Sequence, residues 1–289
     1  MSDNGEEKLA YRSWNPIRGC TRISAGCQNC YAERFAFRLA GPGQPYEDLA
    51  MMTKDGPRWT GKIRLVPELL EVPMHWRRSS MVFVNSMSDV FHEDVPYEFI
   101  NDIFRSMEQS YWHTFFIITK RPNIMNSWYE QWYLQQKKEL PKNVWLGVSV
   151  ENQLAADNRI PFLLKVPAAI RFLNCEPLLG PIDLSHYIDQ KSCRIDWITV
   201  GAESGYRARP MNENWVRAIR DQCISAGIRF SFRRKPVDGQ PVIDLSLDGV
   251  VWSQRPDCVI VPPPKKANRS RRGPLQSYQL EFDFSDKQN

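Results

Sequence analysis

Short apolar runs recur along the chain at fairly even intervals. Each has the length of a β-strand and is rich in valine, isoleucine or phenylalanine, and the runs cover residues 81–85, 115–119, 144–150, 170–173, 197–200 and 228–232. Branched and aromatic side chains in runs of this length predict β-strands. Because the runs are apolar throughout, they fit a sheet that is covered on both faces.

Segments with helical spacing separate several of these runs. Residues 31–39, 98–109 and 215–226 place apolar side chains three or four positions apart, which predicts amphipathic helices. Strands that alternate with helices indicate βαβ units and a parallel sheet. Six or seven such units favour an α/β fold of the TIM-barrel type, partial or complete, over a doubly wound open sheet.

Polar residues cluster directly after almost every apolar run. The candidate site residues in these clusters are Asn85, Ser86, Asp89, Lys120, Arg121, Glu151, Cys175, Glu176, Glu203, Arg207 and Arg209. In parallel α/β folds the carboxyl ends of the strands build the active site. A single polar cluster is typical of a solvated loop, but five at the same end of predicted strands indicate an enzyme.

Three cysteines near the start of the chain carry the clearest chemistry. Cys20, Cys27 and Cys30 form a C-x6-C-x2-C loop, with a glycine before two of the three thiols. Three thiolates from one loop match a [4Fe–4S] cluster whose fourth iron stays open to a ligand. A zinc site completed by Cys175, Cys258 or a histidine is an alternative, and three unliganded thiols are another.

Composition narrows the class of protein. The chain has 289 residues, of which 42% are hydrophobic and 25% charged, with a formal net charge of +5; these values suit a soluble globular protein and permit nucleic-acid binding. No apolar run approaches the ~18 residues that cross a bilayer. Seven cysteines and a polar N-terminus argue against a disulfide framework and a signal peptide. We therefore expect free thiols in a cytoplasmic protein without a membrane partner.

The C-terminal region, residues 261–289, differs from the predicted barrel region, residues 1–260. Prolines and basic residues predict a disordered tether. The tether leads to an apolar hexapeptide that contains Gln279, Leu280, Phe282 and Phe284. This hexapeptide resembles the motif by which bacterial replication and repair proteins bind the sliding clamp, and it predicts a docking peptide. An edge strand packed on the barrel is the alternative.

Several longer motifs resemble a known family. They are WNP at residues 14–16, the cysteine loop, VNSMSDVFH at 84–92, ITKRP at 118–122, WLGVSVE at 145–151, RFLNCEPLLGP at 171–181, GAESG at 201–205, ARP at 208–210 and WVR at 215–217. Together they resemble a phage- and prophage-associated three-cysteine-motif family of uncharacterised proteins. That family is distantly similar to radical SAM enzymes, among them spore photoproduct lyase. The resemblance implies a (β/α)6-like partial barrel with a cluster at its open end.

The resemblance also implies roles for the candidate residues. Cys20, Cys27 and Cys30 would bind the cluster, and S-adenosylmethionine (SAM) at the fourth iron would yield a 5′-deoxyadenosyl radical after reduction by an electron donor. SAM would be held by Asn85, Ser86, Asp89, Glu151 and Glu203. Cys175, beside Glu176, would donate a hydrogen atom, or would be a packed thiol at the barrel rim. Lys120, Arg121, Arg207 and Arg209 would contact phosphates of a DNA or RNA substrate, or would pair with local carboxylates. A base would stack on Trp14, Tyr31 or Trp145.

Two departures and two alternatives accompany this hypothesis. Radical SAM loops usually have three residues, not six, between the first two cysteines. The nearest match to their Gly-Gly-Glu element, Gly201-Ala202-Glu203, comes late in the chain. The alternatives are a zinc- or cluster-stabilised DNA-binding accessory factor without enzymatic activity, and a redox sensor that does not cleave SAM.

Overall fold

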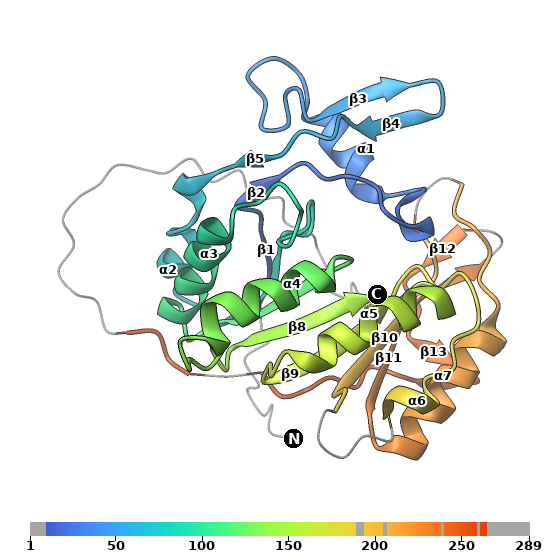
Figure 1. The fold of residues 1–289 in the computed structure, drawn as a ribbon. Coiled ribbons are helices and arrows are strands. Elements are labelled where there is room, and N and C mark those ends of the chain that lie inside the picture. Colours follow the sequence, from blue (N-terminus) through green and yellow to red (C-terminus); the bar gives the residue numbers. More distant parts are fainter. Residues whose placement is uncertain (1–9, 189–193, 205–206, 238–239, 259–260, 265–289) are drawn as a thin grey trace, which may run out of the picture.

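Seven parallel strands form a curled sheet in the order in which they occur in the sequence (Figure 1). They are β1 (Ala10–Trp14), β6 (Ser80–Val84), β7 (Thr114–Thr119), β8 (Val144–Ser149), β9 (Ile170–Cys175), β10 (Trp197–Gly201) and β11 (Arg229–Val237). β12 (Gln240–Val242) adds an antiparallel edge to β11. The computed structural model describes residues 10–188, 194–204, 207–237, 240–258 and 261–264.

Helices connect successive strands and cover the convex face of the sheet. They are α2 (Val72–His75), α3 (Tyr97–Gln109), α4 (Pro122–Tyr129), α5 (Gln153–Lys165), α6 (Ser185–Ile188) and α7 (Glu213–Ala226). Within the described residues the strand order runs from β1 to β12 without closing. The predicted α/β fold is therefore confirmed as a parallel half-barrel, and the six predicted strands and three predicted helices are all present.

Alternating strand positions separate two apolar layers. Val82 and Ile117 belong to the main core together with helix residues such as Ile103. A second cluster on the concave face contains Met81, Trp145, Phe172 and Trp197. This division follows from the strand itself, in which successive side chains point to opposite faces.

The chain after β11 crosses the amino end of the half-barrel. After the hairpin of β13 (Ser246–Leu247) and β14 (Val250–Val251), Gln254 accepts a hydrogen bond from the backbone N of Phe230 at the start of β11. Arg255 then donates to the hydroxyl of Tyr11 in β1, and Cys258 packs against the concave cluster. This segment, residues 252–258, is called the strap, and it covers the amino end of the concave face of the sheet.

The cysteines lie in an insertion between β1 and β6. β2 (Ile17–Arg18) pairs with β5 (Arg64–Leu65), and β3 (Ala50–Thr53) pairs with β4 (Gly56–Trp59). Between them stand a 3-10 turn, Ala25–Cys27, and α1 (Tyr31–Arg38). A small separate core that includes Ala36, Leu49 and Met87 joins this insertion to the segment after β6.

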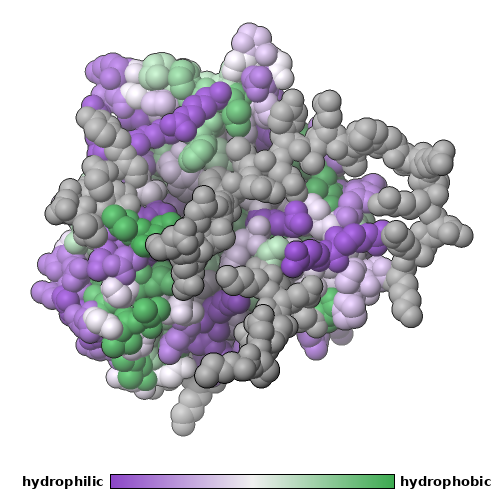
Figure 2. Space-filling view, turned by 180° about the vertical axis from the view of Figure 1, so that it is seen from behind, coloured by the Kyte–Doolittle hydropathy of each residue, from purple (hydrophilic) through white to green (hydrophobic). Residues whose placement is uncertain are grey.

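Within the described ranges no helix is long and apolar enough to cross a membrane. On the face shown in Figure 2, hydrophobic residues appear as several separate groups among hydrophilic ones. The predicted docking residues Gln279, Leu280, Phe282 and Phe284 lie outside the described residues, so the docking peptide stays a prediction.

Candidate metal centre

The cysteine loop lies over the carboxyl ends of the central strands. The backbone N of Gly26 donates to Glu151 Oε1 (3.3 Å), directly after β8. Asn29 Nδ2 donates to Glu203 Oε2 (2.9 Å), after β10. The hydroxyl of Tyr31 donates to the backbone O of Ser86 (2.5 Å), after β6. The three thiols and the polar strand ends, which are far apart in the sequence, therefore meet at one edge of the sheet.

Arg121, after β7, holds the start of the loop. Its Nη2 donates to the backbone O (3.2 Å) and to Oγ1 (2.5 Å) of Thr21. The same guanidinium pairs with Asp89 (3.3 Å) and with Glu93 (2.5 Å). Arg121 is only 4% exposed, so its positive charge interacts with these protein carboxylates and not with solvent.

His92 completes this attachment. The backbone N of Asp94 donates to His92 Nδ1 (3.2 Å), so Nε2 carries the ring proton and donates to Thr21 Oγ1 (2.8 Å). Burial lowers the pKa of His92, with a further contribution from Arg121, which favours the neutral ring. Thr21 immediately follows Cys20, so the attachment fixes the first thiol.

A clamp of Glu203 and Arg209 holds the other end of the loop. Arg209 donates to both carboxylate oxygens of Glu203 (Nη2 to Oε1, 2.5 Å; Nε to Oε2, 2.9 Å). It also donates to the backbone O of Ala25 (2.8 Å) and to Gln28 Oε1 (3.2 Å). Burial acts to raise the pKa of Glu203, but the hydrogen bonds from Arg209 and Asn29 outweigh it and lower the pKa below its ordinary value.

Two glycines allow the loop to approach this closely. Gly19 has φ +90°, and a Cβ there would lie 2.1 Å from the backbone O of Lys62. A Cβ on Gly26 would lie 3.2 Å from the carboxyl carbon of Glu151. The glycines before Cys20 and Cys27 are therefore explained by backbone conformation and by close contact.

The three half-buried thiols are close enough to influence one another. Burial raises the pKa of Cys20 to about 12, and Asp89, Cys30 and Cys27 add to the rise. Burial likewise raises the pKa of Cys30. At Cys27 burial is again the largest influence, but the charge of Lys120 and nearby hydrogen bonds together lower the pKa.

The residues present fit a cluster held by three thiolates. No group of three or more His, Cys, Asp or Glu side chains in the described part of the chain could hold a metal ion together. A [4Fe–4S] cluster binds each thiolate through a different iron, so its ligands need not converge on one ion. Asn85, at the same strand edge, is 2% exposed, and neither of its side-chain amide atoms has a hydrogen-bond partner among the described residues. A buried polar group without a partner calls for an explanation, and binding of a ligand is one that a candidate site offers.

Comparison with protein-family models gives one relation for this chain. The model described as "Protein of unknown function (DUF5131)" matches residues 7–256. The chain belongs to the DUF5131 family. No curated protein and no solved structure matches it. The predicted membership of a family of uncharacterised proteins is thus confirmed, while the similarity to radical SAM enzymes stays a hypothesis.

In this DUF5131 chain, most of the residues predicted to hold SAM contact other protein groups. Glu151 pairs with Arg159 (2.7 Å) and Glu203 with Arg209. Asp89 accepts from Thr119 Oγ1 (2.7 Å) and from the backbone N of Lys120 (3.0 Å), and Ser86 Oγ bonds Ser13 Oγ (2.5 Å). These side chains hold the site together, and among the five it is Asn85 whose side-chain polar atoms have no hydrogen-bond partner in the described part of the chain.

Cys175 is the last residue of β9, but its side chain faces away from the mouth of the half-barrel. It is 0% exposed and packs in the main core between sheet and helices. Burial, with Cys223 of α7 nearby, strongly raises the pKa of its thiol. This placement favours a packed thiol, the alternative to a hydrogen-atom donor, because the thiol packs against the helix layer. Glu176 does lie at the edge, where it pairs with Arg234 (3.1 Å).

The predicted phosphate contacts fall into two groups. Arg121 and Arg209 hold the cysteine loop and pair with carboxylates, which is the second of the two roles predicted for these cations. Arg207 is exposed, with φ +69°. Lys120 is half-buried, and its Nζ donates to Ser149 Oγ (3.2 Å). Lys120 and Arg207 thus stay candidates.

The aromatic residues predicted to stack on a base also differ in position. Trp14 is 2% exposed in the main core, and its Nε1 donates to the backbone O of Leu69 (2.8 Å). Trp145 is 1% exposed in the concave cluster. Both are therefore covered by other side chains, and Tyr31 is the member of the three that contacts the strand edge.

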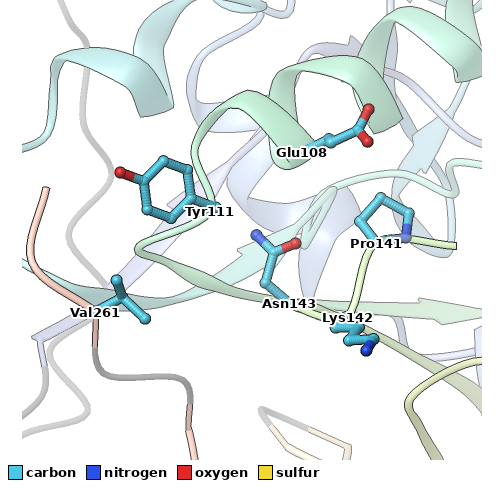
Figure 3. A pocket seen from close by; sticks show the side chains of 6 residues that line it. All are labelled: Glu108, Tyr111, Pro141, Lys142, Asn143 and Val261. Carbon is cyan, nitrogen blue, oxygen red and sulfur yellow. The ribbon is translucent and has the colours of Figure 1, made fainter. Parts of the chain in front are cut away.

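A pocket lies at the opposite end of the sheet from the cysteines. Figure 3 shows it between the end of α3, the segment before β8 and the chain after the strap, and its lining residues are Glu108, Tyr111, Pro141, Lys142, Asn143 and Val261. Asn143 Nδ2 donates to the backbone O of Met107 (2.9 Å) and of His113 (3.1 Å). Its amide therefore stabilises the turn, and the pocket brings no cysteine or histidine side chain to its surface.

Sequence reasoning missed the anchors of the loop. Thr21, Asn29 and His92 were within or beside the quoted motifs, but their roles depend on contacts between distant segments. The one local signal of tight packing in the loop was the glycine directly before Cys20 and before Cys27.

Proposed function

We propose that this protein is a [4Fe–4S] enzyme of the radical SAM type that acts on nucleic acid. The observation that carries the proposal is the position of Cys20, Cys27 and Cys30. They stand on one loop that is hydrogen-bonded to residues after β6, β7, β8 and β10. In barrels of parallel strands this edge is the one that carries chemistry.

The chain's own residues supply position and charge. The three thiolates would hold the cluster, and the anchors at Thr21, Gly26 and Asn29 would fix their spacing. A bound and reduced cluster would supply the one electron that cleaves SAM into methionine and a 5′-deoxyadenosyl radical. Lys120 places a positive charge near Cys27 and Cys30, which offsets the negative charge of thiolates and sulfides.

Asn85 is the residue best placed to bind a ligand at this edge. Its buried amide offers one acceptor and two donors without described partners. An amino acid group such as that of SAM presents both a donor ammonium and an acceptor carboxylate. Asn85 would therefore bind the ligand, whereas Glu151, Glu203 and Asp89 would position the groups around it.

The test is anaerobic reduction of the full-length protein with SAM. We expect 5′-deoxyadenosine in wild type and none in Cys27→Ala. Cys258→Ala is the matched control, because Cys258 is a half-buried thiol at the amino end of the sheet. Cluster-loaded protein that yields no 5′-deoxyadenosine would identify a redox sensor, and a colourless protein with one zinc would identify the accessory factor; either result contradicts the proposal.

A further inference from the structure

A partly exposed pair of aromatic rings lies on the concave face of the sheet. Phe83 of β6 and Phe116 of β7 are stacked, with ring centroids 4.7 Å apart and planes at 21°. They are register partners in the parallel ladder. Both rings keep some exposed surface, whereas Phe115 on the opposite face of β7 is 0% exposed. The concave face therefore has a flat apolar wall that a ligand is able to reach.

The concave face beside this wall is covered at its amino end. The strap places Cys258 against the concave cluster, and Arg255 reaches Tyr11 of β1. Trp145 and Phe172 are 1% exposed in that cluster. Entry is therefore from the carboxyl ends of the strands, where the cysteine loop lies.

Lys120 adds a cation to the same wall. Successive inward positions of β7 and its extension are Phe116, Ile118 and Lys120. The ammonium donates to Ser149 Oγ and forms no ion pair with any described carboxylate. Arg121 and Arg209, by contrast, are both ion-paired. Two of the three ammonium protons of Lys120 are thus left for an anion.

We propose that this wall binds one unstacked nucleotide, with its base against Phe83 and Phe116 and its phosphate at Lys120. The inference rests on the proposed function and names the subsite at which nucleic acid would be held. A flat ring joined to an anionic group complements a stacked aromatic surface beside an ammonium. A base inside a duplex has no free face, so the occupant is a single-stranded or extruded nucleotide.

The test measures binding by fluorescence anisotropy, with the cluster-reconstituted full-length protein and a short labelled oligonucleotide. We expect single-stranded DNA or RNA to bind more tightly than the same sequence as a duplex. Phe83→Leu and Phe116→Leu keep an apolar side chain but remove the flat ring, and each should weaken binding at least about fivefold. Phe162→Leu, on the helix layer at α5, should bind as wild type.

Salt dependence tests the contribution of the cation. Lys120→Gln should lower the slope of log affinity against log salt concentration by about one, as expected for one phosphate contact. Lys165→Gln, at the exposed end of α5, should leave the slope unchanged. Iron and sulfide content is measured for every variant, so that loss of the cluster is separated from loss of the nucleotide subsite.

Three results would overturn the inference. The first is wild-type protein that holds its cluster but binds no oligonucleotide. The second is Phe83→Leu and Phe116→Leu proteins that have the melting temperature and the oligonucleotide affinity of wild type. The third is preferential binding of an aromatic peptide that carries a carboxylate, which would identify a protein rather than a nucleic-acid partner for the same wall.

Discussion

At the scale of single residues, Gly19 determines how closely the cysteine loop lies against the chain beneath it. Its φ of +90° is a conformation that side chains avoid, and the backbone O of Lys62 occupies the place of a Cβ. Strain of this kind costs about 1–3 kcal/mol even before the clash is counted. We expect Gly19→Ala to lower both the free energy of unfolding and the iron bound per chain.

Gly43→Ala is the matched control for this substitution. Gly43 also has a positive φ of +72°, but nothing lies within 4 Å of the position of its Cβ. Denaturant unfolding and iron analysis of both variants separate backbone strain from the close contact. Equal effects of the two substitutions on iron content would contradict the role assigned to Gly19.

Asn85 should be a residue whose removal does not harm folding. Its φ is +54°, which glycine adopts without strain, and a buried amide without partners costs about 1–3 kcal/mol. We expect Asn85→Gly to unfold at the same or a higher temperature than wild type while SAM binding weakens. A clear drop in melting temperature would instead show that the amide stabilises the fold.

Cys175 should contribute to packing and not to chemistry. Because it is fully buried in the main core, Cys175→Ser would bury a hydroxyl among apolar groups at a cost of about 1–3 kcal/mol. Cys175→Ala should leave SAM cleavage and product formation intact. A folded Cys175→Ala protein that cleaves SAM but forms no substrate product would restore the hydrogen-donor role.

At the scale of elements, the Glu203–Arg209 clamp joins the segment after β10 to the cysteine loop. The pKa of Glu203 is lowered in the folded protein from 4.5, so its contribution to stability is present above that value and is lost as pH falls through the lowered pKa. We expect Glu203→Gln to flatten the loss of stability as pH falls from neutral to below 4.5. Melting temperatures of wild type and Glu203→Gln across this pH range measure the difference.

Asp248→Asn is the control for the pH series. Asp248 is an exposed partner of Arg217 and Arg220, far from the cysteines in the sequence. Its substitution should change the pH profile without changing iron content, whereas Glu203→Gln should reduce iron content as well. Unchanged iron content in Glu203→Gln would remove the clamp from the account of the metal centre.

The elements that sequence patterns predicted are those with continuous apolar runs. β7 and β8 are buried strands rich in apolar side chains, many of them branched or aromatic, and this composition can be recognised from the sequence alone. β1, with the sequence AYRSW, has too few apolar residues to be predicted, because it becomes a strand through its parallel ladder with β6. The strap was missed for the same reason, because its contacts with β11 and β1 define it. The β3–β4 hairpin is a local pairing, but its strands, AMMT and GPRW, lack a run of branched or aromatic residues.

The candidate site shows the same limit. The three cysteines and the polar strand ends were predicted from spacing alone, since parallel strands bring their carboxyl ends together. Which charges are paired was not predictable, because a lysine and an arginine at neighbouring positions look alike in sequence. Only the fold shows that Arg121 is buried against Asp89 while Lys120 is not ion-paired with a described carboxylate.

At the scale of the whole molecule, the half-barrel is closed at one end and carries its chemistry at the other. The strap covers the amino end, and the cysteine loop covers the carboxyl end. In the proposed function, the cluster and the substrate would both lie at the carboxyl end. This arrangement links the metal centre to the concave wall of Phe83 and Phe116.

The C-terminal hexapeptide predicts a recruitment function that is separable from the site. We expect Leu280→Ala and Phe282→Ala, in the full-length chain, to abolish binding to a bacterial sliding clamp while iron content stays at the wild-type level. Lys287→Ala, beyond the hexapeptide, is the control. Clamp binding that survives both substitutions in a surface-plasmon-resonance assay would contradict the docking prediction.

The most direct test of the central claim is metal and sulfide analysis of anaerobically purified full-length protein, with electron paramagnetic resonance after reduction. The account predicts about four irons and four sulfides per chain, the signal of a reduced [4Fe–4S] cluster, and loss of both in the Cys20→Ala, Cys27→Ala and Cys30→Ala variants. One tightly bound zinc per chain, or a cluster that persists without these three thiols, would contradict it.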